Sequence, residues 1–154
     1  TMHPNAELIQ RFYTAFKNKD YITMQRCYTD NASFTDEAFV NLNAAEVRAM
    51  WEMLIKSGKD LTLEYSNIQA NDTTGSAMWV ATYTFSRTGN KVVNHIQAEF
   101  AFSENKIVSH RDHFNFYKWS RQALGLTGWM LGWTSPLQKK VQQTARKSLQ
   151  AFME

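Results

Sequence analysis

Apolar residues recur at helical spacing in three stretches near the start of the chain. The first predicted helix begins at an N-cap residue, Asn5, and ends near residue 18. The second follows the N-cap Asp20, and the third occupies residues 44–57, between Asn43 and Gly58. The core-facing positions are Leu8, Ile9, Phe12, Ala15 and Phe16 in the first helix, and Val47, Met50, Trp51 and Leu54 in the third.

Apolar and polar residues alternate along four later runs that are rich in β-branched and aromatic side chains. The runs cover residues 61–69, 76–87, 91–103 and 106–117, separated by the short polar segments NDTTG, RTGN and SEN. Such segments suit hairpins, so we expect four consecutive antiparallel strands.

Residues 119–154 return to helical spacing and form a predicted C-terminal helical extension. Thr134 and Pro136 begin its last helix, whose apolar stripe consists of Leu137, Val141, Ala145, Leu149 and Phe152. The preceding segment GLTGWMLGW, residues 125–133, has three interpretations. It packs against the body of the protein, closes the mouth of a pocket, or exchanges onto a partner subunit.

Helices followed by a long antiparallel sheet bury their apolar stripes on one face of that sheet. We therefore predict an α+β fold in which a cone-shaped, strongly curved, mostly antiparallel sheet wraps around the N-terminal helices, with an extra C-terminal helix. The open end of such a cone is the expected ligand entrance. No linker divides the chain, so residues 1–154 are predicted to form one domain.

Composition narrows the possible classes of protein. Aromatic residues make up 14% of the chain, which requires a large core or an apolar pocket. The single Cys27 cannot form an intrachain disulfide, and no apolar run reaches the roughly 18 residues of a membrane span, so we expect a cytoplasmic protein without membrane contact. A solvated helix face explains the basic residues of the last helix better than nucleic-acid or lipid binding.

Strand parity places His110 and Asp112 side by side, because residues two apart in a strand point the same way. Their row continues to Phe114 and Phe116, and the apolar row of the preceding strand, which includes Ala98 and Phe100, is expected beside it. A carboxylate in an apolar space is costly unless it is paired. The pair is either a general base with its orienting partner or a hydrogen-bonded polar couple without a catalytic role.

The order of elements resembles the nuclear transport factor 2-like superfamily, in particular its SnoaL-like and ketosteroid isomerase-like branches. The segments that carry this resemblance are LIQRFYTAFKNKDY, YTDNASFTDEA and KVVNHIQAEFAFSENKIVSHRDHF. The resemblance implies a curved sheet, a deep apolar pocket and a homodimer formed through the outer face of the sheet.

Within the isomerase branch, the resemblance assigns the general base to Asp36, which is otherwise explained as a turn residue. It places Phe12 and Ala98 where those enzymes have their two oxyanion donors. Losing one such donor typically costs roughly 2.7–4 kcal/mol of transition-state stabilisation, so we reject steroid isomerisation by that route. Asp112 beside His110 instead resembles the acid–base carboxylate of SnoaL-type cyclases, with Asn115 or His95 as alternatives for that position.

The leading hypothesis is a small-molecule enzyme, an isomerase, cyclase or hydratase acting on an apolar carbonyl compound. Its alternatives are a noncatalytic module that binds an apolar ligand and a protein-interaction scaffold. No metal-ligand spacing and no nucleotide-binding motif occurs, so we expect neither a metal nor a cofactor, and we expect no nucleic-acid partner. The predicted catalytic residues are Asp112, His110 and Asp36, and the predicted pocket residues are Phe12, Tyr13, Met50, Trp51, Ala98, Phe100, Phe114 and Phe116.

Overall fold

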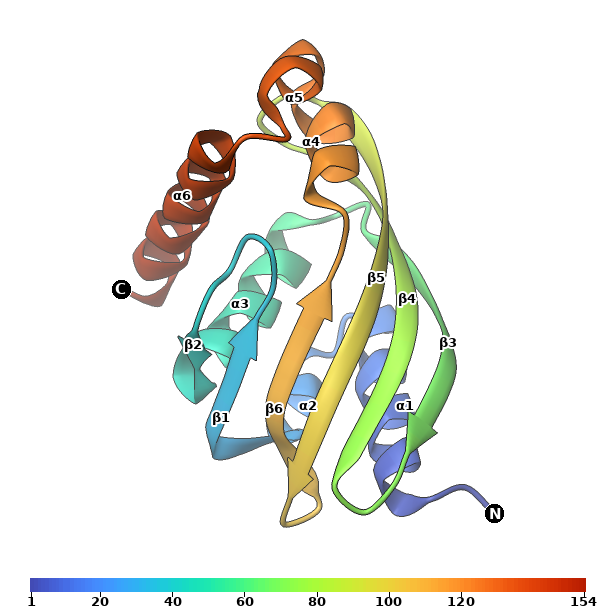
Figure 1. The fold of residues 1–154 in the computed structure, drawn as a ribbon. Helices are drawn as coiled ribbons and strands as arrows, with labels where there is room; N and C mark the ends of the chain where they lie inside the picture. The colour runs from blue at the N-terminus through green and yellow to red at the C-terminus, as the bar shows by residue number, and fades with distance from the viewer.

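The computed structural model describes residues 1–154 and contains six helices and six strands (Figure 1). The helices are α1 (Pro4–Lys17), α2 (Tyr21–Arg26), α3 (Ala44–Ser57), α4 (Phe116–Leu124), α5 (Leu126–Leu131) and α6 (Ser135–Met153). The strands are β1 (Tyr28–Thr35), β2 (Leu42–Asn43), β3 (Thr62–Ala70), β4 (Thr74–Phe85), β5 (Asn90–Ser103) and β6 (Lys106–His113). None of the helices combines the length and the hydropathy needed to cross a bilayer.

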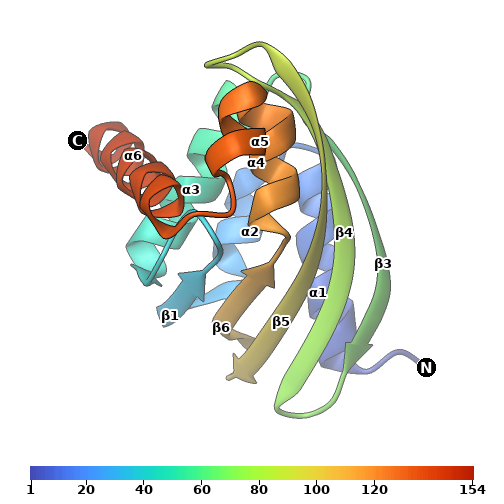
Figure 2. The ribbon, with the colours of Figure 1, turned by 45° about the horizontal axis from the view of Figure 1, so that its top comes forward.

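All six strands belong to one sheet, in the order β2-β1-β6-β5-β4-β3. Only the β1–β6 pair is parallel; the other neighbours are antiparallel. The long strands bend, and α1, α2 and α3 lie on the concave side of the sheet (Figures 1 and 2). The α+β fold with a curved sheet, N-terminal helices and a C-terminal helix is confirmed.

Local hydrogen bonds fix the ends of the first helices. At α3 the predicted cap is confirmed, since the Asn43 side chain accepts from the backbone N–H of Glu46 and the Glu46 side chain accepts from that of Asn43, both at 2.9 Å. At α1 the cap is His3, whose Nδ1 accepts from the backbone N–H of Asn5. Asn5 is buried and donates its amide to the backbone oxygen of Asn71, so the prediction of Asn5 as the cap was wrong.

The last strand is shorter than its alternating pattern predicts. Strand β6 ends at His113, and the Asn115 side chain accepts from the backbone N–H of Lys118 at 3.0 Å to cap α4. Phe116 is therefore helical and packs with Val92 and Trp119 in a small second core cluster. A strong N-cap residue outweighed the strand periodicity here.

Helix α4 packs beside β5 and α5 packs on α4, while α6 lies next to α3 (Figure 2). Helix α5 approaches α4 closely because Gly128 and Gly132 have no side chain; a Cβ at either position would overlap Ser120. Helix α6 contacts α3 and buries only Leu149 fully. Arg146 attaches α6 to the body, donating to the Glu46 carboxylate at 2.9 Å and to the backbone oxygen of Val40 at 2.7 Å.

Arg146→Gln should loosen α6 without unfolding the protein, because few buried side chains otherwise hold this helix. We expect faster amide hydrogen exchange in α6 than in the parent, unchanged exchange in α3, and a loss of about 1 kcal/mol or less in global stability. Lys147→Gln, which removes a neighbouring charge that makes no ion pair, is the matched control. Equal protection of α6 in Arg146→Gln and in the parent protein would contradict this assignment.

Candidate active site

Four side chains from three elements form a buried chain of hydrogen bonds. The Trp51 indole N–H on α3 donates to the Tyr28 hydroxyl on β1 at 2.9 Å. The Tyr28 hydroxyl lies 2.7 Å from Nδ1 of His110 on β6, and Nε2 of His110 lies 2.9 Å from Oδ1 of Asp112. His110 and Asp112 are each 2% exposed, so their hydrogen bond is buried.

One assignment of hydrogens satisfies every member of this chain. An indole N–H can only donate, so Tyr28 accepts from Trp51 and directs its own O–H to Nδ1 of His110. Burial raises the pKa of Tyr28 well above its ordinary value, more than the Trp51 hydrogen bond lowers it, so the phenol keeps its proton. Nε2 of His110 then bears the ring proton and donates it to the Asp112 carboxylate.

Aromatic rings enclose the imidazole on several sides. The ring of Phe100 lies 4.4 Å from it between centroids, Phe34 lies at 4.9 Å and Phe12 at 5.8 Å. The predicted strand parity is confirmed, because Phe100 pairs with His110 across the sheet and Ala98 pairs with Asp112. Close packing on these sides leaves the imidazole one orientation, in which it points its Nε2 at Asp112.

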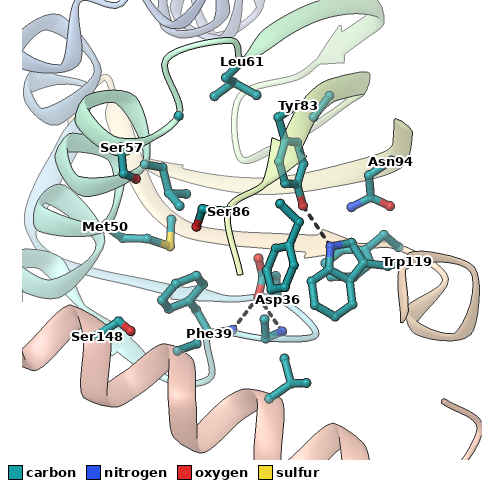
Figure 3. A pocket seen from close by; sticks show the side chains of 18 of the residues that line it. Asp36, Phe39, Met50, Ser57, Leu61, Tyr83, Ser86, Asn94, Trp119 and Ser148 are labelled. Carbon is teal, nitrogen blue, oxygen red and sulfur yellow. Dashed lines mark hydrogen bonds between the residues drawn. The ribbon is translucent and has the colours of Figure 1, made fainter. Parts of the chain in front are cut away.

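A cavity of about 770 Å³ lies between α3, α6, the β4–β5 part of the sheet and the segment after β1. Its walls are mainly apolar, and Asp112 reaches it from the sheet while Asp36 reaches it from the loop after β1. Among the predicted pocket residues, Met50, Trp51 and Phe114 line it. Figure 3 shows the cavity bounded by α6 on one side and by Tyr83, Asn94 and Trp119 on the other.

The other predicted pocket residues do not line the cavity: Phe12, Tyr13, Ala98, Phe100 and Phe116. The first four belong to the main core, where α1 packs directly on the sheet and leaves no space between them. Phe116 belongs to the second cluster beside α4. The cavity therefore lies farther along the sheet, toward the C-terminal helices, than the sequence predicts.

Asp36 is both a turn residue and a cavity residue (Figure 3). Its Oδ1 accepts from the backbone N–H groups of Ala38 at 2.7 Å and Phe39 at 2.6 Å. Burial raises its pKa from 3.8 to about 7, and the nearby Asp112 charge adds to this rise, while the hydrogen bond from Phe39 opposes it. A carboxyl group with this pKa is partly protonated at neutral pH, which suits a proton donor.

Several polar side chains in the wall were not predicted, among them those of Tyr83, Asn94 and Trp79. Tyr83 accepts from the Trp119 indole N–H at 2.8 Å, and burial raises the pKa of its hydroxyl. Asn94 is buried and lines the cavity, and Nε1 of the buried Trp79 has no hydrogen-bond partner in the protein. The position of Asn94 within the apolar row of its strand, between Val92 and Ile96, is the sequence signal that could have identified it.

The two residues considered as alternatives for the acid–base position, His95 and Asn115, do not line the cavity. His95 is exposed on the outer face of the sheet, and Asn115 is occupied as the cap of α4. No three His, Cys, Asp or Glu side chains come together as a set of metal ligands. The polar residues of the cavity wall thus include two carboxyl groups, the Tyr83 phenol and the Asn94 amide, together with two cations, Arg87 and Lys140, and several serine and threonine hydroxyls.

Solved structures with the same fold come from several bacterial proteins. AclR, a proposed hydroxylase from Streptomyces galilaeus, is 21% identical with a TM-score of 0.65 over 85% of this chain and 99% of its own. An epoxide hydrolase of the LEH-like type from M. tuberculosis is 15% identical, with a TM-score of 0.64 over 82% of this chain and 95% of its own. IdmH, a proposed polyketide cyclase from Streptomyces antibioticus, is 17% identical, with a TM-score of 0.66 over 80% of this chain and 100% of its own.

At these identities the structural likeness establishes the fold alone. No functionally curated protein matches the chain in sequence. The SnoaL-like domain family matches residues 9–110, which include α1 from Ile9 onward, α2, α3, the whole of β1 to β5, and β6 as far as His110. On that match, together with the curved sheet and its cavity, the chain belongs to the SnoaL-like domain family.

Proposed function

We propose that the protein is an acid–base enzyme that removes a proton next to the carbonyl group of an apolar molecule, as an isomerase, cyclase or hydratase does. The observation that supports it best is the Asp112 carboxylate, which reaches the cavity while His110 holds its Oδ1 at 2.9 Å. The other carboxylate oxygen makes no hydrogen bond within the protein. It is the atom that accepts the substrate proton.

The buried chain behind Asp112 acts by positioning. Because the Trp51, Tyr28 and His110 side chains are fixed by packing, the carboxylate does not need to reorganise when the substrate binds. His110 donates its Nε2 proton to Oδ1 and so sets which oxygen remains free. Tyr28 fixes the tautomer of His110 by donating to Nδ1.

Asp36 supplies the acid. Proton removal places negative charge on the substrate oxygen, which needs a donor in the transition state. Two backbone N–H groups occupy Oδ1 of Asp36, so a protonated Oδ2 can donate to that oxygen. Two carboxyl groups whose environments differ in this way are the usual basis for separate acid and base roles. The Asn94 amide in the cavity wall is an additional donor for a carbonyl oxygen.

The cavity favours a multi-ring apolar substrate. Its volume of about 770 Å³ falls among those of drug-sized ligand sites, which are roughly 300–1,000 Å³. Two proteins of similar fold are associated with small organic molecules: TerC was crystallised with polyporic acid, and another is a proposed polyketide cyclase from Xanthomonas campestris. These are properties of the neighbours, and they support the proposal by analogy only.

Exchange of α-protons for deuterium tests Asp112 as the base, and it does not require the natural substrate to be known. With β-tetralone in deuterated buffer, the protein should accelerate exchange at the carbon next to the carbonyl, followed by proton NMR. Asp112→Asn keeps the shape of the side chain and should lower the rate by at least roughly a hundredfold, the usual contribution of a positioned base.

Tyr28→Phe should lower the exchange rate less than Asp112→Asn and also change its pH profile, because Nδ1 of His110 then loses its donor. Tyr65→Phe removes a surface hydroxyl that bonds Thr14 and is the matched control. A wild-type rate equal to that of buffer, with β-tetralone shown to be bound, would contradict catalysis and favour a noncatalytic binding module. An unchanged rate in Asp112→Asn would remove Asp112 from the mechanism.

The raised pKa of Asp36 should appear in the pH dependence of stability. Between its ordinary pKa of 3.8 and its folded value of about 7, the folded protein holds a proton that the unfolded chain has released. The unfolding free energy therefore falls as pH rises through this window, by at most about 4 kcal/mol. Asp36→Asn keeps the Oδ1 acceptor and should flatten this fall, as measured by urea unfolding at a series of pH values. Glu104→Gln, at an exposed carboxylate that makes no ion pair, should leave it unchanged, and identical slopes in all three proteins would contradict the shift.

A further inference from the structure

Helix α5 and the residue after its C-cap present a cluster of large apolar side chains to solvent. The apolar tip, as we name this cluster, consists of Leu126, Trp129, Met130, Leu131 and Trp133, and each of these residues is between 49% and 75% exposed. Contiguous exposed apolar patches on soluble proteins usually mark contact sites. The tip lies at one extremity of the molecule, away from the N-terminus (Figure 1).

Close packing of α5 on α4 directs these side chains outward. Gly128 and Gly132, one helical turn apart, form the face that contacts Ser120, so the larger residues between and around them lie on the opposite side. The Arg121 guanidinium stacks on the Trp129 ring at 4.4 Å, and the Tyr117 hydroxyl donates to the Trp129 backbone oxygen at 3.1 Å. The tip is therefore a built surface, held in place by polar contacts on its inner side.

The segments before and after α5 in the sequence carry charge of one sign. Six of the 17 basic residues of the chain and none of its 14 acidic residues fall between positions 116 and 153. Lys118, Arg121, Lys139 and Lys140 flank α5 in sequence and make no ion pair. Lys118 and Arg121 line the same surface hollow as Trp129.

Two tryptophans with leucine and methionine, bordered by unpaired cations, are the composition of a helix that lies in a membrane interface. Tryptophan favours the headgroup level, and the cations favour anionic headgroups. A symmetric contact with a second copy of the chain would instead bring two such basic segments together with no acid in either. Like charges therefore oppose that contact and favour an anionic bilayer.

We propose that the apolar tip docks the protein on the surface of an anionic lipid bilayer, with α5 lying in the headgroup region. A helix of six residues is far too short to cross a bilayer, so this is surface binding. Thr127 of α5 and Leu137 and Lys140 of α6 line the cavity, so the docked surface adjoins the cavity wall. We expected no membrane contact from the sequence for two reasons. The lack of a spanning segment does not bear on a surface helix. The preference for a solvated basic face on the last helix was based on charge alone, without the exposed apolar side chains of α5.

Vesicle co-sedimentation of the full chain tests this proposal. We expect the protein to sediment with phosphatidylcholine vesicles that contain phosphatidylglycerol, more weakly with phosphatidylcholine alone, and less as salt rises. Trp129→Ser/Trp133→Ser should weaken binding at least roughly tenfold by removing interfacial aromatic surface. Lys139→Glu/Lys140→Glu should weaken binding to anionic vesicles roughly thirtyfold or more, since each basic residue near the surface contributes about 1 kcal/mol.

Met2→Ser/Ile22→Ser removes exposed apolar side chains outside the tip and should leave vesicle binding unchanged. Circular dichroism and thermal unfolding of each variant verify that the fold is intact. Absence of sedimentation with either vesicle type would overturn the proposal. Equal sedimentation of the parent, Trp129→Ser/Trp133→Ser and Lys139→Glu/Lys140→Glu would also overturn it. A change from dimer to monomer in Trp129→Ser/Trp133→Ser on size exclusion, without vesicle binding by the parent, would assign the tip to a second copy of the chain.

Discussion

The structure depends on satisfying one imidazole and one phenol inside an aromatic core. A buried donor or acceptor without a partner typically costs about 1–3 kcal/mol, and here the partners come from separate elements. Tyr28 on β1 reaches Trp51 on α3 and His110 on β6, so the bonds form only when β1 lies parallel to β6 with α3 across them. The same bonds that close the core also leave Asp112 facing the cavity.

The remaining parts of the site follow from where the core ends. Helix α1 fills the concave side of the sheet with Phe12 and Tyr13, and beyond them the space is enclosed by α3, α6 and the loop after β1. That loop places Asp36 in an apolar wall, where burial and the charge of Asp112 raise its pKa. The C-terminal helices complete the wall, and α6 is held by hydrogen bonds from Gln142 and Arg146 and by one fully buried side chain, Leu149.

Much of the fold and one pair in the site could be predicted from local patterns. Strand alternation was enough to bring His110 and Asp112 together and to place Ala98 and Phe100 beside them. The partners of His110 could not be predicted this way, because Tyr28 lies 82 positions from it and no local period connects the two. The pocket boundary was misplaced because apolar periodicity shows only which side chains are buried. It cannot distinguish the buried side chains that pack against α1 from those that line the cavity. The end of β6 was misplaced because apolar and polar residues continue to alternate as far as residue 117. The helix-capping tendency of Asn115, which begins α4, was given less weight.

The central claim is that Tyr28 fixes His110 as a neutral ring that donates from Nε2 to Asp112. Nitrogen-15 NMR of the histidine side chains at neutral pH tests it directly, since protonated and unprotonated ring nitrogens differ widely in chemical shift. The account predicts that the His110 resonances show a protonated Nε2 and an unprotonated Nδ1, and that Tyr28→Phe disturbs this state. A proton on Nδ1 in the parent protein, whether alone or together with one on Nε2, would contradict it.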